Sequence, residues 1–275
     1  MGTVIVEKAR PHVTVLRLNR PERRNAMSIE LCLELKDALE STGRDNACWV
    51  IILTGAGSAF CSGLDLKDES VIPNIDGLTI PRIGPRAIRI YSQLIPIMRH
   101  VPQPVIAAIN GPAYGGGMCL TLAADLRVAS ELAVFNSTGI VHGLTSTELG
   151  ASWLLPRLIG AAHANDILLT GRRVTAGEAL RMGLVSRVVP DPELFDCAVQ
   201  IAERMCEFSP YGVQMTKQVI WANLENTSLA AAIELEDRNQ IMLGMTDNLP
   251  EAISAFGKKR KPVFTDEPRR GVYRS

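Results

Sequence analysis

The sequence predicts an α/β protein with a helical C-terminal region. Short apolar, β-branched runs at 49–53 and 105–109 are typical of buried strands, although their period alone leaves a buried helix open. Segments with apolar residues at helical spacing lie between such runs. After residue 190 no strand pattern occurs and the helical spacing continues. We therefore expect a core domain (1–190) and a helical region (191–275) whose apolar faces are buried on the core or on another subunit.

Local signals place the elements of the first half. Ser28 can cap a helix that runs to about Glu40. A second helix is expected at 86–100, kinked or ended near Pro96. Before it, the segment 68–85 contains three prolines and is predicted to be a long loop, and loops of this length are often functional. Strands are expected at 4–6, 13–18, 49–53, 105–109, 126–129, 133–135 and 185–189.

The second half is predicted to be mainly helical. A glycine-punctuated loop is expected at 137–146. Thr175 and Glu178 form a capping box for a short helix that Gly183 ends. The spacing of apolar residues predicts further helices at 149–158, 161–169, 192–208, 210–225, 228–244 and 250–257.

Composition excludes several classes of protein. The chain of 275 residues carries 29 basic and 29 acidic residues, and this balance argues against broad electrostatic binding of nucleic acid. No apolar run reaches the ~18 residues of a membrane span, and the N-terminus lacks the pattern of a secretory signal. The six cysteines show no zinc-binding spacing. We expect a cytoplasmic protein with reduced thiols, no metal and no nucleic-acid partner.

One stretch, 104–125, organises the chain. Its apolar run ends at Asn110-Gly111-Pro112, and the glycines at 115–117 then open a helical pattern. A strand that stops at glycines and restarts as a helix presents free backbone N–H groups at a positive helix end. Such a site suits an anion, or an oxygen that becomes negative during reaction. The alternative is a turn that needs glycine only for its backbone dihedral angles.

A second glycine-bearing stretch follows the strand at 49–53. Gly55-Ala56-Gly57 begins like a dinucleotide fingerprint, but Phe60 takes the third glycine position and no helix pattern follows. We therefore reject a dinucleotide site. The next residues, CSGLDLK at 61–67, again place a glycine beside apolar residues after a strand.

These motifs, in this order, resemble the crotonase superfamily, the enoyl-CoA hydratase/isomerase fold. The resemblance runs nearly from end to end. It is carried by LNRP at 18–21 with Asn25-Ala26, ILTG at 52–55, FxSGLDL at 60–66, PVIAAING at 104–111, GGG at 115–117, LTG at 169–171, the segment 179–185, and FxKKRxPxF at 256–264.

The resemblance implies a spiral of repeated ββα units and a helical C-terminal region that covers the active site and forms a homotrimer or a dimer of trimers. It implies an acyl-CoA substrate, with coenzyme A as part of the substrate and no further cofactor. By position, the backbone N–H groups of Leu64 and Gly116 hold the thioester oxygen, and Lys259 or Lys261 approaches the CoA phosphates. The implied binding residues are Ser62, Gly63, Leu64, Asp65, Leu66, Lys67, Gly115, Gly116, Cys119, Gly139 and Lys259.

The chain departs from hydratases of this family at both catalytic glutamates. The first, two residues beyond the glycine triplet, is Cys119 here, and the second, twenty residues later, is Gly139. One positioned acid or base is worth ~10²–10⁴ in rate, against ~10²–10³ for one oxyanion donor, so the larger part of the usual catalytic power is missing. A thiol with an ordinary pKa of about 8.5 is a poor replacement acid, and we expect Cys119 to serve in packing.

Glu148 is the carboxylate retained in the right neighbourhood. Relatives that isomerise dienoyl-CoA or displace an aryl halide resemble the stretch 147–157 and carry a working aspartate at this position. Glu148 is therefore the candidate acid/base, and capping of the helix that follows is the alternative. His142 is a second candidate titrating group, for which a structural role is the alternative. Ser137 and Thr138 rank behind both.

Two functions follow from these residues. The first is an acyl-CoA lyase or isomerase of fatty acyl or related metabolism. Isomerisation of a double bond needs one acid/base, whereas hydration requires Glu148 to act with a second group. The second is an acyl-CoA-binding protein with little catalysis, which the missing glutamates motivate. RNA binding, as in an atypical relative, is disfavoured by the neutral charge. The loops 68–85 and 137–146 are expected to shape the acyl pocket.

Overall fold

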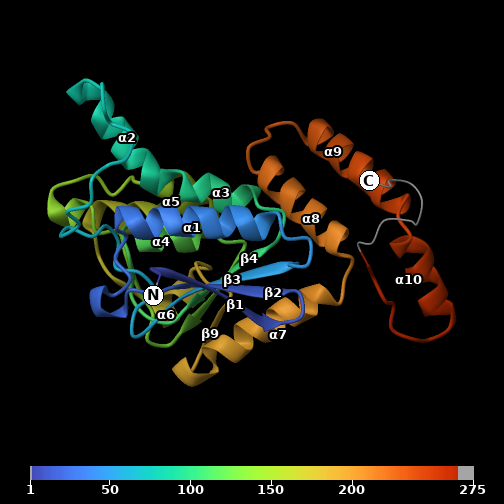
Figure 1. Ribbon diagram of the computed structural model, residues 1–275. Helices are drawn as coiled ribbons and strands as arrows, with labels where there is room; N and C mark the ends of the chain where they lie inside the picture. The colour runs from blue at the N-terminus through green and yellow to red at the C-terminus, as the bar shows by residue number, and fades with distance from the viewer. Residues whose placement is uncertain (1, 266–275) are drawn as a thin grey trace.

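The chain folds around a sheet whose strands run in sequence order (Figure 1). The computed structural model describes residues 2–265; the rest of the expected helical region lies outside the described residues. In the main sheet, β1-β2-β3-β4-β6-β9, the first pair is antiparallel and every later pair is parallel. A smaller sheet joins β5, β7 and β8. The strands are β1 (Val4–Arg10), β2 (Val13–Leu18), β3 (Val50–Gly55), β4 (Val105–Ile109), β5 (Ala113–Tyr114), β6 (Leu126–Ser130), β7 (Val134–Asn136), β8 (Val174–Thr175) and β9 (Arg187–Val189).

Helices cover both faces of the main sheet. Alternate residues of β2, β3 and β4 point to opposite sides, so each strand contributes to two apolar cores. The larger core joins the sheet mainly to α1, α3, α4 and α5, and the smaller one joins it to α7 on the other face (Figure 1). Strands buried on both faces have the continuous apolar character that the sequence displays. The five helices are α1 (Ile29–Gly43), α3 (Leu94–His100), α4 (Gly116–Ala123), α5 (Ala151–Thr170) and α7 (Leu194–Cys206).

Several predicted boundaries are confirmed by specific contacts. The Ser28 hydroxyl accepts a hydrogen bond from the Leu31 N–H at the start of α1. Thr175 caps α6 (Ala176–Arg181) in the same way. The strand expected at 105–109 is β4 without change.

Other predictions were wrong in detail, because prolines were read as helix breakers. The segment 68–85 is not wholly irregular, since α2 (Ile80–Ser92) begins inside it. The helix expected at 86–100, with a kink or an end near Pro96, does divide in two at Gln93, and α3 forms its second part. Pro96 therefore lies in the first turn of α3, where its missing N–H leaves no helical hydrogen bond unmade.

The prediction of two helices at 149–158 and 161–169 is confirmed within α5. Gly160, with φ of 78° and ψ of 159°, is not helical and separates the two helical segments. The element begins at Ala151, two residues later than predicted.

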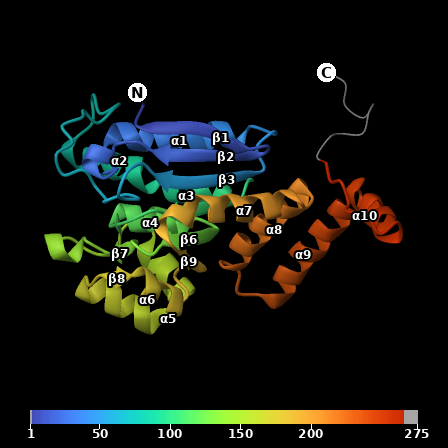
Figure 2. The same cartoon turned by 90° about the horizontal axis from the view of Figure 1, so that it is seen from below.

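The C-terminal helices leave the core after α7. The three helices α8 (Pro210–Asn223), α9 (Leu229–Gly244) and α10 (Asn248–Gly257) extend to one side of it (Figures 1 and 2). Between Val189 and residue 265 the structure has no strand, as predicted. The boundary near residue 190 stays a prediction, and α7 packs on the sheet although it follows that point. Among the described residues, no helix has the length and apolar character needed to cross a bilayer.

A buried ion pair fastens α8 to the core. The Lys217 ammonium lies 3.0 Å from the Asp125 carboxylate and donates hydrogen bonds to the carbonyl oxygens of Met98 and Gln103, each at 2.9 Å. Trp221 donates to the same carboxylate at 2.6 Å. Burial lowers the pKa of Lys217 although the neighbouring carboxylate opposes this shift. The pair was not predicted, because nothing in the sequence links positions so far apart.

Asp125→Ala is expected to destabilise the fold by about 3–5 kcal/mol, because it leaves the Lys217 ammonium buried without its counter-charge. Urea unfolding measures the change. The double variant Asp125→Ala/Lys217→Met should recover part of the loss, since it removes the unpaired charge. A single variant as stable as the unaltered protein would contradict this role for the pair.

Candidate active site

The two glycine-bearing loops of the sequence lie against each other. The Tyr114 N–H donates to the Cys61 carbonyl at 2.9 Å, in a short parallel bridge between the loops. Gly63 and Gly115 both have positive φ, 89° and 49°. A Cβ atom on Gly63 would lie 2.8 Å from the Tyr114 carbonyl oxygen and 3.6 Å from the Gly115 Cα. The loops therefore approach this closely only because glycine occupies position 63.

Two unpaired backbone N–H groups flank this contact. Leu64 follows Gly63, and its N–H has no acceptor among the described residues. Gly116 follows Gly115 and is the first residue of α4, so its N–H has no partner within the helix. The amides on either side are used, since Gly115 donates to Asn136 at 2.9 Å and Asp65 to Met27 at 3.1 Å. The arrangement can place two donors near one oxygen atom.

Glu148 lies beside the same loops. A Cβ atom on Gly115 would be 3.2 Å from the Glu148 Oε1 and 2.7 Å from the Thr138 Oγ1. The Glu148 carboxylate makes no hydrogen bond or ion pair with another described residue, and burial raises its pKa. It does not cap α5, because the N-cap is Gly150 and no side chain bonds to the first turn. The structure therefore contradicts the alternative that the Glu148 side chain caps the helix that follows.

The backbone around Glu148 has an unusual conformation. Leu149 has a φ of 46°, and Gly150 follows with 83°. A leucine in this left-handed region costs roughly 1 kcal/mol and persists only where its surroundings hold it. The Glu148 carbonyl accepts hydrogen bonds from the Ala151 N–H at 2.8 Å and the Cys119 thiol at 3.5 Å. No sequence signal marks a left-handed leucine, and this feature was missed.

Neither of the two positions where hydratases carry glutamates supplies an acid or a base in this chain. Cys119 is buried, and burial and then the charge of Glu148 raise its pKa well above the usual value, so its thiol is no proton donor or acceptor near neutral pH. A Cβ atom on Gly139 would lie 2.0 Å from the Thr145 carbonyl oxygen. This backbone therefore cannot carry any side chain at position 139.

The other residues expected to bind CoA differ in their surroundings. The Asp65 carboxylate is buried, lies 2.8 Å from an Arg20 nitrogen and accepts the Lys67 N–H at 3.0 Å, so it supports the loop from within. The Ser62 hydroxyl donates to the Arg23 carbonyl at 3.4 Å. The side chains of Leu64, Leu66 and Lys67 form the exposed edge of this loop.

Two residues that were predicted to belong to the site, Lys259 and His142, do not lie beside the glycine loops in this chain. Lys259 follows α10, which lies at the end of the molecule far from α4 in both views, and the neighbouring Lys261 pairs with Glu207 at 3.4 Å (Figures 1 and 2). One chain alone thus does not bring Lys259 to its own candidate site. His142 is exposed on the short helix η2 (Ile140–His142).

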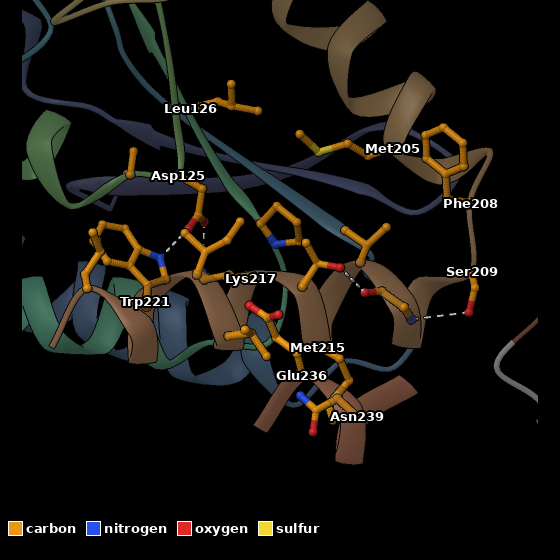
Figure 3. Close-up of a pocket in the computed structure, with 18 of the residues that line it drawn as sticks. Asp125, Leu126, Met205, Phe208, Ser209, Met215, Lys217, Trp221, Glu236 and Asn239 are labelled. Atoms are coloured by element: carbon orange, nitrogen blue, oxygen red, sulfur yellow. Dashed lines mark hydrogen bonds and ion pairs between the residues drawn. The ribbon is translucent and has the colours of Figure 1, made fainter. Parts of the chain in front are cut away.

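A large cavity lies elsewhere, between the core and the helices α8 and α9 (Figure 3). Its volume is about 1030 Å³ and its walls are mainly apolar, with Asp125, Lys217 and Trp221 at one side. Asn239 of α9 is buried at its edge with both amide atoms unpaired. The cavity does not include the glycine loops or Glu148. Among the described residues no group of side chains is arranged to hold a metal ion.

Solved structures share this architecture. A probable enoyl-CoA hydratase/isomerase from Mycobacterium abscessus superposes with a TM-score of 0.92 at 45% identity, over 97% of this chain and 100% of that one. A monofunctional enoyl CoA isomerase from M. smegmatis superposes with a TM-score of 0.72 at 41% identity, over 85% and 99%. The spiral core with its helical C-terminal region is the crotonase fold, as the resemblance implied.

Sequence relatives agree with the fold. A profile of the enoyl-CoA hydratase/isomerase family matches residues 8–267. The probable enoyl-CoA hydratase echA12 of Mycobacterium bovis is 48% identical over 97% of this chain and 94% of its own length. The 1,2-epoxyphenylacetyl-CoA isomerase of Escherichia coli is 35% identical over 96% and 99%. The chain belongs to the enoyl-CoA hydratase/isomerase family.

Glu148→Gln is expected to stabilise the fold at neutral pH. Burial raises the pKa of Glu148, so the folded protein keeps a proton there at a pH where the unfolded chain has lost it. The charged form lowers stability above the folded pKa, and this penalty vanishes below the unfolded value of about 4.3. Thermal unfolding at about pH 7 and about pH 4 should therefore give a gap between variant and parent that shrinks on acidification. An equal gap at both pH values would contradict the burial effect.

Proposed function

We propose that the chain moves a proton along the acyl group of a CoA thioester, in the manner of an enoyl-CoA isomerase. The N–H groups of Leu64 and Gly116 hold the thioester oxygen, and Glu148 is the acid/base. The observation that carries the proposal is the position of one unpaired, partly buried carboxylate beside two unpaired amides. No cofactor is needed, because coenzyme A is part of the substrate. The absence of disulfides among the described cysteines supports a reducing compartment such as the cytoplasm.

Each group has a defined task in this mechanism. The Glu148 carboxylate takes a proton from a carbon activated by the thioester, and the electrons of that C–H bond move toward the carbonyl oxygen. The resulting enolate oxygen accepts hydrogen bonds from Leu64 and Gly116, each donor being worth ~10²–10³ in rate. The protonated Glu148 then returns the proton to another carbon of the chain. Burial raises the pKa of Glu148 toward the working pH, which favours both steps, because an effective acid/base titrates near that pH.

Hydration is less well supported than isomerisation. It requires groups that position and activate a water molecule, and positions 119 and 139 supply no carboxylate. Position 139 also lacks space for one. A hydratase activity would therefore depend on Glu148 together with a different group.

Glu148→Gln is expected to lower kcat/KM for the best substrate of an enoyl-CoA panel by about 10²–10⁴, because it removes the acid/base and keeps the side-chain shape. Spectrophotometric turnover measures the loss, and calorimetry with CoA checks that binding persists. Glu131→Gln, on an exposed carboxylate outside the site, is the matched control. Equal rates in the parent and Glu148→Gln would remove Glu148 from the mechanism.

The alternative function is acyl-CoA binding with little catalysis. The two replaced glutamates motivate it. Tight binding of acyl-CoA without turnover across the whole panel would favour this alternative, and efficient turnover of any member would exclude it.

We also propose that the chain acts as a homotrimer or a dimer of trimers. The helices α8–α10 project from the core and carry exposed apolar side chains, and the cavity beside them has the unpaired Asn239 at its edge. A second copy would fill this space and would bring its Lys259 to a neighbouring CoA site. The exposed apolar residues of these helices include Leu229, Ile241, Met242, Ile253 and Phe256.

Phe256→Asp, at a side chain that is 87% exposed, should weaken the assembly with little effect on the fold of the core, because it places a charge on an apolar contact surface. Sedimentation velocity measures the mass, and circular dichroism checks the fold. A monomeric parent protein at micromolar concentration would contradict the proposed assembly.

A further inference from the structure

The loop 137–146 contains two hydroxyl groups that make no hydrogen bond with another described residue, those of the half-buried Thr138 and the exposed Thr145. The Ser137 hydroxyl donates to the Ser146 carbonyl at 3.2 Å, and the Ser146 hydroxyl donates to the Ser137 carbonyl at 3.4 Å. The Ser146 oxygen also accepts the Ile140 N–H at 3.3 Å. These bonds hold the loop in one shape. The Thr138 hydroxyl, next to Ser137, makes no hydrogen bond with another described residue.

The Thr138 hydroxyl faces the candidate site. Its oxygen and the Glu148 Oε1 both lie close to the point where Gly115 would carry a Cβ atom, at 2.7 and 3.2 Å, so at most 5.9 Å separates the two oxygens. They are not bonded to each other. Gly116, whose N–H is a proposed donor to the thioester oxygen, directly follows Gly115 in the chain. Two unpaired polar groups thus lie beside the start of the acyl chain.

This pair favours one kind of acyl group. A purely hydrocarbon chain would displace water from both oxygens without replacing its hydrogen bonds, which is unfavourable. An oxygen on the acyl chain about two carbons from the thioester could accept a hydrogen bond from Thr138 and bond to Glu148 in either protonation state. We propose that Thr138 is a specificity-determining residue that, with Glu148, binds an oxygen atom carried by the acyl group. The inference rests on the proposed function, because it takes the acyl chain to lie against Gly116.

Calorimetry of two matched ligands tests the proposal without relying on turnover. The ligands are butanoyl-CoA and 3-hydroxybutanoyl-CoA, each enantiomer measured separately, with chromatography to verify that the ligand is unchanged. The parent protein should bind one hydroxy enantiomer about tenfold or more tightly than butanoyl-CoA. Thr138→Val should bring this ratio close to one, and Thr138→Ser should keep it. Thr145→Val, at an exposed threonine of the same loop, is the control and should change nothing.

Three outcomes would overturn the assignment. The parent could bind both ligands equally well, or Thr138→Val could keep the preference. The third is that Thr138 binds a water molecule rather than an oxygen atom of the acyl group. In ¹⁸O-labelled water, Thr138→Val would then abolish the incorporation of label into a 2-enoyl-CoA and leave the hydroxyacyl preference unchanged. Failure of the proposed function has a different signature, because a fully active Glu148→Gln would disprove the acid/base role whatever Thr138 binds.

Discussion

The site depends on the direct contact of two backbone loops at position 63. The Tyr114 carbonyl occupies the space that any side chain there would fill, so the loops meet main chain to main chain. Parallel strands β3 and β4 deliver both loops to the same edge of the sheet. Because no side chain separates them, the free amides of Leu64 and Gly116 come to lie on either side of the contact. The remaining groups of the site are arranged around this contact.

Glu148 is held in that arrangement at a cost to stability. Its carboxylate is partly withdrawn from water without a cation to compensate, and the leucine after it has a left-handed conformation. Both features are unfavourable by themselves, and the packing of Leu149 on Gly116 and the bond from Cys119 offset them. Unfavourable local features that surrounding structure maintains are typical of functional positions. Cys119 thus contributes to the position of Glu148 by donating a hydrogen bond to the Glu148 backbone carbonyl, although its thiol takes no part in proton transfer.

Much of the fold could be predicted because its signals are local. The apolar run of β4, the cap at Ser28 and the spacing of the four C-terminal helices each depend on a few adjacent residues, and all are confirmed. The prolines of α2 were misread, since a proline in a first turn and a proline that ends a helix look alike in sequence. The site was predictable only as far as its loops. Thr138 and the pair Lys217–Asp125 depend on contacts between distant segments, for which a single sequence has no pattern.

The crowded glycine at position 139 restricts which variants of the protein can fold with this loop. Its hydrogen atom faces the Thr145 carbonyl at a distance that no carbon substituent tolerates. A codon change to glutamate would therefore distort the loop before it could supply a carboxylate. A carboxylate at this position would need accompanying changes that move the Thr145 carbonyl. Any variant that keeps the present loop is in this respect limited to the chemistry that a solitary acid supports.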